Sequence, residues 1–169
     1  MKYIVIVPDG ASDYPIDILE GKTPLEVAET PSMDFLATKG LLGRVKTVPR
    51  GFHPSSDVAN LSLLGYDPRK YYTGRGPLEA ANLGVRLSRA DCAFRCNLIT
   101  EAEGNLLDYS AGHITDREAQ TLINHLNKKL GSTETEFFAG KSYRNLLVIR
   151  RGIQLGLDKL KYFAPHDIM

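Results

Sequence analysis

Uninterrupted apolar runs mark the first part of the chain. Residues 3–7 read Tyr-Ile-Val-Ile-Val, a β-branched run that does not alternate with polar positions and that stops at Pro8, Asp9 and Gly10. A short run of this kind is typical of a parallel strand buried on both faces. Residues 41–49 predict the next strand.

Proline and glycine punctuate the predicted helices. Thr23 is a favourable N-cap, Pro24 takes the first helical position, and Glu26 completes a capping box. A second helix begins in a similar way, with Thr30 as its N-cap and Pro31 at its first position. Gly40 is its natural C-terminal stop. Helices are therefore predicted near Pro24 and over residues 30–40, 57–64 and 77–84.

The pattern changes after residue 84. Residues 89–100 and 105–111 predict the two strands of a hairpin joined around residues 101–105. Residues 113–131 predict the clearest helix, with Thr115 as its cap and one continuous apolar stripe. Two further strands are predicted over residues 133–140 and 142–151.

This element order predicts an α/β fold in two parts. The first part reads as the start of a doubly wound parallel sheet, and the second reads as a separate α+β unit. We place the two domains at residues 1–73 and 74–169. A sheet of so few parallel strands is a poor domain by itself, and the closing stretch 161–169 has no cap or helix. We therefore expect the chain to be part of a longer protein, with its second domain incomplete.

Composition narrows the class of protein. The 169 residues are 43% hydrophobic, with 21 Lys and Arg against 20 Asp and Glu, so there is no basic excess of the kind expected for a nucleic-acid binder. No apolar run is long enough to span a membrane or to form a signal peptide, so a cytoplasmic location is expected. Cys92 and Cys96 lie ~13 Å apart along one predicted strand, which predicts reduced thiols.

Two positions lie where ligands bind in open α/β sheets, at the carboxyl ends of parallel strands. Asp9 follows the first predicted strand, and Ser55 and Ser56 lie between the second predicted strand and a helix start. A hydroxyl at a helix N-terminus faces free amide groups and the positive end of the dipole. An Asp and a Ser in such positions can share a divalent metal that activates the hydroxyl. The alternative is a simple helix cap and a simple Asp-Gly turn.

Basic residues in the second part suggest an anion site. Arg95 and Asn97 are expected on the opposite face of their strand from Cys92 and Cys96, and Arg75 lies between two glycines before a helix. His113 precedes the strongest helix, where it can donate a proton or contact a substrate. Arg144 lies at the start of the last predicted strand. Any one of these side chains alone has the alternative of an ordinary surface position.

The motifs in combination are more specific than each alone. "VPDG", "SDVANLSLLGYDP", "YYTGRGPLEAA", "AFRCNLIT", "DYSAGHIT" and the closing "PHDI" occur in order through essentially the whole chain. Together they resemble the archaeal-type, cofactor-independent (2,3-bisphosphoglycerate-independent) phosphoglycerate mutases of the alkaline phosphatase superfamily. Residues 56–68 carry the most specific part of the resemblance.

The resemblance implies a fold and a chemistry. It implies an alkaline-phosphatase-like doubly wound domain that holds two divalent metals, commonly manganese but also magnesium, zinc or cobalt, with an inserted domain that binds the glycerate. It implies that 3-phosphoglycerate and 2-phosphoglycerate interconvert through a phosphoserine, without 2,3-bisphosphoglycerate. Ser56 would be nucleophile and metal ligand and Asp9 a metal ligand, while substrate contacts would be His113, Arg144, Arg95 and Arg75.

Two departures from the family pattern qualify these expectations. Ser55 stands where the family more often has glycine. The family is also longer than this chain, and its other Asp and His metal ligands lie in the second half. We therefore expect a fragment that is inactive on its own.

The motifs leave several alternatives open. Phosphonopyruvate decarboxylase-like and homoserine kinase-like members of the superfamily share the nucleophile and metal site. The chain can also be a non-catalytic fragment that binds a phosphorylated three-carbon acid, or a decayed remnant. A homo-oligomer or a separate C-terminal half is a possible partner, whereas nucleic acid and membrane are not expected.

Overall fold

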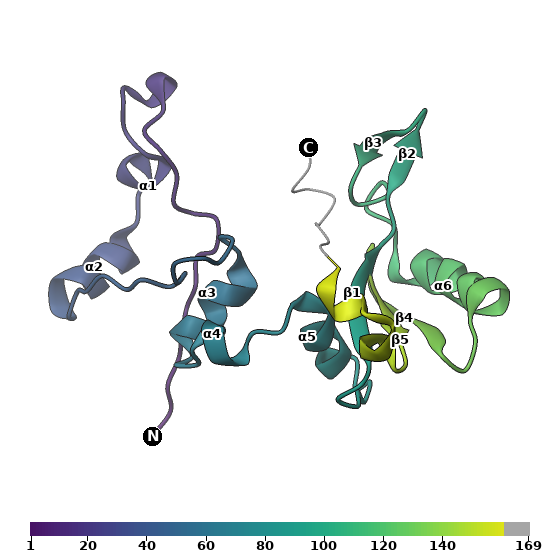
Figure 1. The fold of residues 1–169 in the computed structure, drawn as a ribbon. Coiled ribbons are helices and arrows are strands. Elements are labelled where there is room, and N and C mark those ends of the chain that lie inside the picture. Colours follow the sequence, from purple (N-terminus) through teal and green to yellow (C-terminus); the bar gives the residue numbers. More distant parts are fainter. Residues whose placement is uncertain (161–169) are drawn as a thin grey trace. The chain divides into compact units, whose positions relative to one another are not determined.

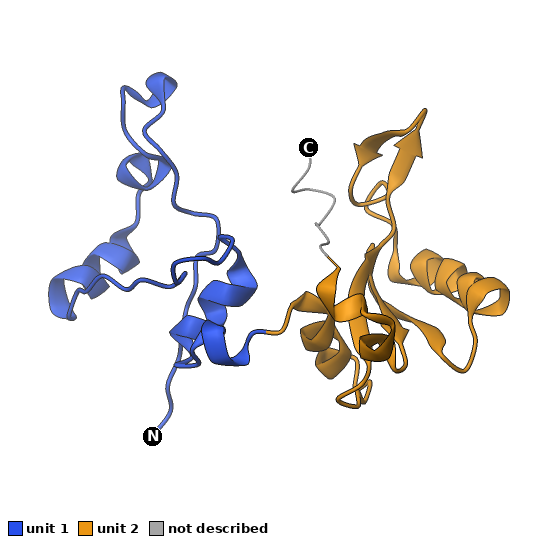
Figure 2. Cartoon of the chain, in the orientation of Figure 1, with its two compact units in different colours: residues 1–72 blue, residues 73–169 orange. Residues whose placement is uncertain are grey.

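The computed structural model describes residues 1–160 and divides the chain into two compact units, residues 1–72 and 73–169 (Figure 2). The division falls one residue before the predicted domain boundary. The closing motif at residues 165–168 lies outside the described residues.

Unit 1 consists of short helices joined by extended segments (Figure 1). Thr23 and Glu26 form the predicted capping box at the start of α1. Thr30 precedes α2 as expected, but its hydroxyl bonds to the Asp34 carboxylate and caps no backbone amide. The elements are η1 (Asp17–Leu19), α1 (Pro24–Val27), α2 (Pro31–Lys39), α3 (Ser56–Leu63) and α4 (Pro68–Tyr71).

The two strands predicted in unit 1 do not form. Residues 3–7 and 41–49 contain no strand, and most of their apolar side chains are exposed, from 47% at Val7 to 103% at Leu41. A parallel strand forms only when neighbouring strands accept and donate its backbone hydrogen bonds. Residues 1–72 supply no such neighbour, since their single β-bridge joins Ile16 to Lys22. The expected doubly wound sheet is therefore not present in the described residues.

Unit 2 is built on a three-stranded antiparallel sheet in the order β1-β5-β4. The strands are β1 (Cys92–Asn97), β4 (Thr135–Lys141) and β5 (Arg144–Ile149). The central strand β5 is the most buried, with Leu146 and Val148 at 0% exposure. The last two predicted strands, over residues 133–140 and 142–151, are thus confirmed as β4 and β5. The turns η2 (Gly152–Leu155) and η3 (Leu157–Lys159) follow β5.

The predicted hairpin is only partly correct. The turn at Glu103 and Gly104 does join two paired strands, β2 (Thr100–Ala102) and β3 (Asn105–Asp108). The longer strand β1 before them pairs instead with β5, almost fifty residues further along the chain. Turn chemistry marks local pairing, whereas a partner distant in sequence leaves no local signal.

Helix α5 (Arg75–Asn82) packs against β1 and β5, whereas α6 (Asp116–Leu130) packs against the edge strand β4 (Figure 1). Ala80 of α5 packs with Leu146 and Val148 in the core of one face. Gly76 permits this packing, because a Cβ there would lie 1.9 Å from the carbonyl oxygen of Ala93. The side chain of Asn127 in α6 bonds to both backbone groups of Phe137 and so satisfies part of the edge of β4.

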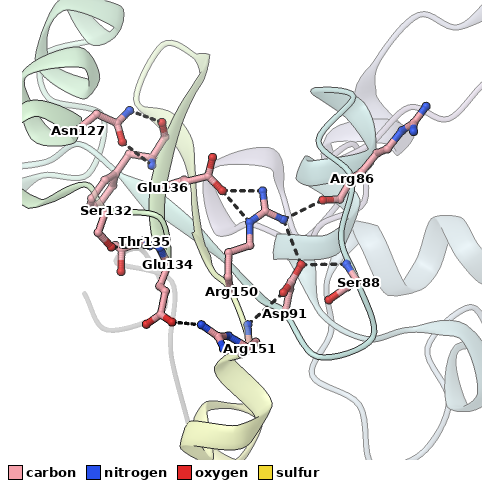
Figure 3. A network of polar contacts seen from close by, with 11 residues as sticks. Arg86, Ser88, Asp91, Asn127, Ser132, Glu134, Thr135, Glu136, Arg150 and Arg151 are labelled. Carbon is pink, nitrogen blue, oxygen red and sulfur yellow. Dashed lines mark hydrogen bonds and ion pairs between the residues drawn. The ribbon is translucent and has the colours of Figure 1, made fainter.

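A polar network around Arg150 ties the start of β1 to the end of β5 (Figure 3). Arg150 bonds Asp91 at 3.0 Å, Glu136 at 2.6 Å and the Arg86 carbonyl at 3.0 Å. The backbone amide of Ser88 and that of Arg151 also donate to Asp91, and these bonds hold the pKa of its carboxyl well below the usual range. The network fixes the loop before β1 against the sheet.

The two cysteines are reduced, as the sequence predicts. Cys92 and Cys96 are both free thiols, and burial raises the pKa of each. Over residues 1–160, no helix combines the length and the apolar character needed to cross a membrane.

Candidate functional site

Ser56 and Asp9 meet in unit 1 although 47 residues separate them. Ser56 is the first residue of α3, and its hydroxyl donates a hydrogen bond to the Asp9 carboxylate at 3.0 Å. Both residues are exposed to solvent. The structure therefore brings together the two residues that the sequence singled out as hydroxyl and carboxylate.

Neither serine acts as a conventional helix cap. Ser55 occupies the N-cap position of α3 but makes no side-chain bond to the helix, and the Ser56 hydroxyl points to Asp9. Ser55 has a φ of −157°, which is extended backbone that any residue adopts, so a side chain there introduces no strain. The first amide groups of α3 and the positive end of its dipole thus remain beside the Ser56 hydroxyl.

The backbone around Ser56 is held from both sides by Tyr72. The Tyr72 hydroxyl donates a short hydrogen bond to Asp57, the residue directly after Ser56. Its ring packs edge-on against Phe52, which precedes the two serines, with ring centroids 6.2 Å apart. This arrangement fixes the start of α3 without a capping bond.

Asp9 and Ser56 supply two oxygen atoms suited to a hard divalent cation. Such a cation needs at least four ligands for a closed protein site. Among residues 1–160, no group of three or more His, Cys, Asp or Glu side chains is placed to hold a metal ion. The pair therefore fits part of a metal site, and its remaining ligands would have to come from other groups.

The three predicted arginines gather in unit 2. Arg75 is the first residue of α5, Arg95 lies on β1, and Arg144 begins β5. Burial is the main cause that lowers the pKa of Arg95, and the like charges of Arg144 and Arg75 lower it further. The nearby carboxylate of Glu79 opposes this shift. The cluster is a partly buried concentration of positive charge, which favours an anion.

Asn97 belongs to this cluster as well. It lies two residues after Arg95 on the same face of β1 and pairs across the sheet with Arg144. Both polar atoms of its side chain are buried without a hydrogen-bond partner in the described structure, as is Nε of Arg95. The alternation of side chains along a strand predicted that Asn97 and Arg95 share a face. No sequence pattern indicated that the Asn97 amide would be buried without a hydrogen-bond partner among residues 1–160.

His113 lies in a strained loop between β3 and α6. Ala111, Gly112 and His113 have φ values of 52°, 67° and 55°, all left-handed. The Asp108 carboxylate holds the loop by accepting bonds from Ser110 and Gly112, and these bonds are the main reason that the pKa of Asp108 is lowered. The positive charge of His113 lowers that pKa further, so the imidazole lies near Asp108.

The His113 loop is anchored beside Arg144. The Ser142 hydroxyl donates to the Ile114 carbonyl at 2.6 Å, and the ring of Tyr109 packs edge-on against that of Tyr143. The Arg144 guanidinium lies over the Tyr143 ring, 5.1 Å from its centroid, and donates to its hydroxyl. The structure thus places the loop next to the turn that carries Arg144.

Known proteins resemble this chain over its full length. A family profile described as 2,3-bisphosphoglycerate-independent phosphoglycerate mutase matches residues 37–169. A Methanothermobacter thermautotrophicus protein named 2,3-bisphosphoglycerate-independent phosphoglycerate mutase 2 is 54% identical over 100% of this chain. A Methanosarcina barkeri protein named 2,3-bisphosphoglycerate-independent phosphoglycerate mutase is 52% identical over 99% of this chain. Both names agree with the resemblance seen in the motifs.

This chain is also similar to a solved structure, that of the PH0037 protein from Pyrococcus horikoshii, with 36% sequence identity and a TM-score of 0.65. The match covers 83% of this chain and 39% of the PH0037 chain. The chain spans 41% and 42% of the length of the two curated relatives. The sequence matches confirm the family that the motifs indicated. The chain belongs to the 2,3-bisphosphoglycerate-independent phosphoglycerate mutase family.

Proposed function

We propose that this chain forms part of a metal-dependent enzyme that interconverts 3-phosphoglycerate and 2-phosphoglycerate through a phosphoserine on Ser56. The observation that carries the proposal is the hydrogen bond of 3.0 Å between the Ser56 hydroxyl and Asp9 at the N-terminus of α3. Membership of the family and the arginine cluster support it.

In the first step, the Ser56 oxygen forms a bond to phosphorus while the bond between phosphorus and O3 of the glycerate breaks. The serine proton ends on the departing O3 oxygen, so charge and atoms balance. After the glycerate reorients, its O2 forms a bond to phosphorus while the bond between phosphorus and the Ser56 oxygen breaks, and the O2 proton ends on that oxygen, which restores the Ser56 hydroxyl. The free amide groups at the start of α3 stabilise the negative charge near Ser56 during both transfers.

Asp9 and Ser56 would supply two ligands to a divalent metal, with manganese the first choice and magnesium, zinc or cobalt as alternatives. When bound, such an ion lowers the pKa of the hydroxyl and offsets the charge of the phosphate. In the absence of the ion, Asp9 orients the Ser56 hydroxyl by accepting its proton in a hydrogen bond.

The arginines of unit 2 would bind the phosphorylated three-carbon acid. Arg75, Arg95 and Arg144 offer several N–H donors in a region where burial strengthens electrostatic attraction. His113, in the anchored loop beside the turn of Arg144, would contact the substrate from the loop side. These assignments make unit 2 the substrate-binding domain and unit 1 part of the phosphatase-like domain.

The exposed apolar segments of unit 1 support the same proposal. Residues 3–7 and 41–49 carry the pattern of buried parallel strands but have no strand neighbours in the described residues. In a polypeptide as long as the relatives, further strands would pair with these segments and complete a doubly wound, alkaline-phosphatase-like sheet.

The test compares Ser56→Ala with Ser55→Ala in a polypeptide of the relatives' length that contains this chain. After a rapid quench with 3-phosphoglycerate and manganese, mass spectrometry should find phosphate on Ser56. Ser56→Ala should lose at least about 10⁴-fold in kcat, as expected for a nucleophile. Ser55→Ala should stay close to wild type, because the Ser55 side chain makes no bond to the helix. Phosphate on another residue, or equal effects of the two substitutions, would refute the assignment.

A second function has one observation in its favour. The three arginines of the cluster all lie in unit 2 of this chain, whereas no group of three or more possible metal ligands is found among residues 1–160. Binding of a phosphorylated acid without turnover is therefore the alternative for the 169-residue chain. Calorimetry with 3-phosphoglycerate and no metal would detect such binding, and Arg95→Gln should abolish it while the exposed Arg89→Gln should not.

A further inference from the structure

Asn97 is the last residue of β1, and its side-chain amide is unusual within unit 2. Both Nδ2 and Oδ1 are buried and have no hydrogen-bond partner among the described residues. A buried amide normally finds partners, because an unpaired donor or acceptor has lost its bonds to water without replacement. An amide left in this state therefore needs an explanation, such as a ligand that completes its bonds.

Two other asparagines in the same unit show the usual outcome. Asn145, 1% exposed, accepts from the Gly140 amide and donates to the Tyr143 carbonyl. Asn127 bonds both backbone groups of Phe137. Both of these amides have hydrogen-bond partners for donor and acceptor, and Asn97 differs from them.

The surroundings of Asn97 indicate what its amide can bind. Arg144 is its cross-strand partner, Arg95 lies two residues away on the same face, and the charge of Arg75 also reaches Arg95. Arginine side chains supply only donors. The Asn97 amide adds an acceptor and a neutral donor, so it complements a group that both gives and accepts a hydrogen bond. A hydroxyl has this property, whereas a phosphate or carboxylate does not.

We propose that Asn97 is a specificity-determining residue that recognises the free hydroxyl of a phosphorylated hydroxy acid whose anionic groups are bound by the arginines. The hydroxyl donates to Oδ1 and accepts from Nδ2, and the buried amide gains the partners that it lacks. The inference rests on the proposed function, because it takes the arginine cluster as the site of the phosphorylated acid.

The test measures binding of two ligands to the 169-residue chain by calorimetry. The first is 3-phosphoglycerate, and the second is 3-phosphonooxypropanoate, which has the same anionic groups but lacks the hydroxyl. Wild type should bind the first at least about tenfold more tightly, because the second leaves the amide unpaired. Asn97→Leu has a side chain of similar size without polar atoms. This variant should bind both ligands equally, because its affinity for 3-phosphoglycerate falls while its affinity for 3-phosphonooxypropanoate stays the same.

A stability measurement separates recognition from a structural role. Asn97→Leu removes two unpartnered polar atoms, so its unfolding midpoint should equal or exceed that of wild type. Asn145→Leu is the matched control, since it removes an amide whose bonds are formed, and its midpoint should fall. Glu79→Gln tests the nearby carboxylate as a competing acceptor and should keep the tenfold preference.

The outcomes distinguish the two proposals. If wild type binds both ligands equally, or if Asn97→Leu keeps the preference, the role of Asn97 is refuted while the proposed function stands. If wild type binds neither ligand, the anion site of the proposed function fails, and the role of Asn97 fails with it. If Asn97→Leu unfolds as readily as Asn145→Leu, Asn97 is a structural residue.

Discussion

Replacing Arg150 with methionine removes the centre of the polar network in unit 2 but keeps most of the aliphatic length of the side chain. The change deletes the bonds to Asp91, Glu136 and the Arg86 carbonyl. It leaves the Asp91 carboxylate, whose side chain is only 6% exposed, with backbone donors but without its charged partner. The loop before β1 thereby loses its side-chain tie to the end of β5, while the bond from the Arg151 amide to Asp91 remains (Figure 3).

The structure sets the size of the effect. The bond to Asp91 is the costly one to lose, because hydrogen bonds to buried charged groups contribute about 1.5–3 kcal/mol. The bond to Glu136 counts for less, since the side chain of Glu136 is 38% exposed and solvent screens the pair. Because the amides of Ser88 and Arg151 still donate to Asp91, part of its stabilisation survives. We expect a loss of about 2 kcal/mol in the free energy of unfolding.

The loss should depend on pH in a defined direction. The native fold lowers the pKa of Asp91, chiefly through the Ser88 amide and partly through Arg150. A lowered native pKa contributes stability that is present above the unfolded value, about 3.9, and is lost as pH falls through the native value. The difference between wild type and Arg150→Met should therefore be largest near neutral pH and should shrink as the pH falls below about 4.

Hydrogen exchange of the β5 backbone amides reports the stability of unit 2 directly. A loss of about 2 kcal/mol corresponds to exchange roughly 30-fold faster at these protected positions. Arg151→Met is the control, because Arg151 and its partner Glu134 have side chains 62% and 54% exposed, and such pairs contribute little. Equal exchange rates in the two variants at neutral pH would show that burial of Asp91 does not give the network its strength.

Two further predictions concern the close packing of α5 and the incomplete metal site. Gly76→Ala should destabilise unit 2 by about 1–3 kcal/mol, because its Cβ would overlap the Ala93 carbonyl, whereas Gly43→Ala has open space and should be nearly neutral in the same urea titration. The 169-residue chain with manganese should show no steady conversion of 3-phosphoglycerate, because Asp9 and Ser56 supply too few ligands to hold the ion. Sustained turnover in a coupled enolase assay would contradict that account.

Local signals in the sequence predicted the helices well. Thr115 caps α6 as expected and forms a capping box with Glu118, and α6 runs over the predicted apolar stripe. A cap, a proline at the first position and a 3.6-residue period involve only neighbours along the chain, so they can be recognised without knowing the tertiary structure. The positions of Ser56 at a helix start and of Arg95 and Asn97 on one strand face follow from the same kind of signal.

Pairing between strands was less predictable. Residues 3–7 carry a strand pattern but form no strand in the described structure, and β1 pairs with β5 in place of the expected neighbour. An apolar pattern indicates that a segment can be buried in a sheet, but it does not indicate which strand pairs with that segment through backbone hydrogen bonds.

The sequence alone located most of the helices, though not their end residues, and it indicated the family and the residues worth testing, because caps, periodicity and ordered motifs are properties of neighbouring positions. Only the tertiary structure decided that the Ser56 hydroxyl bonds Asp9 and caps no helix, and that the Asn97 amide is buried without a partner. Both facts depend on contacts between segments far apart in the chain. Such contacts arise from packing and backbone pairing, which no local pattern encodes.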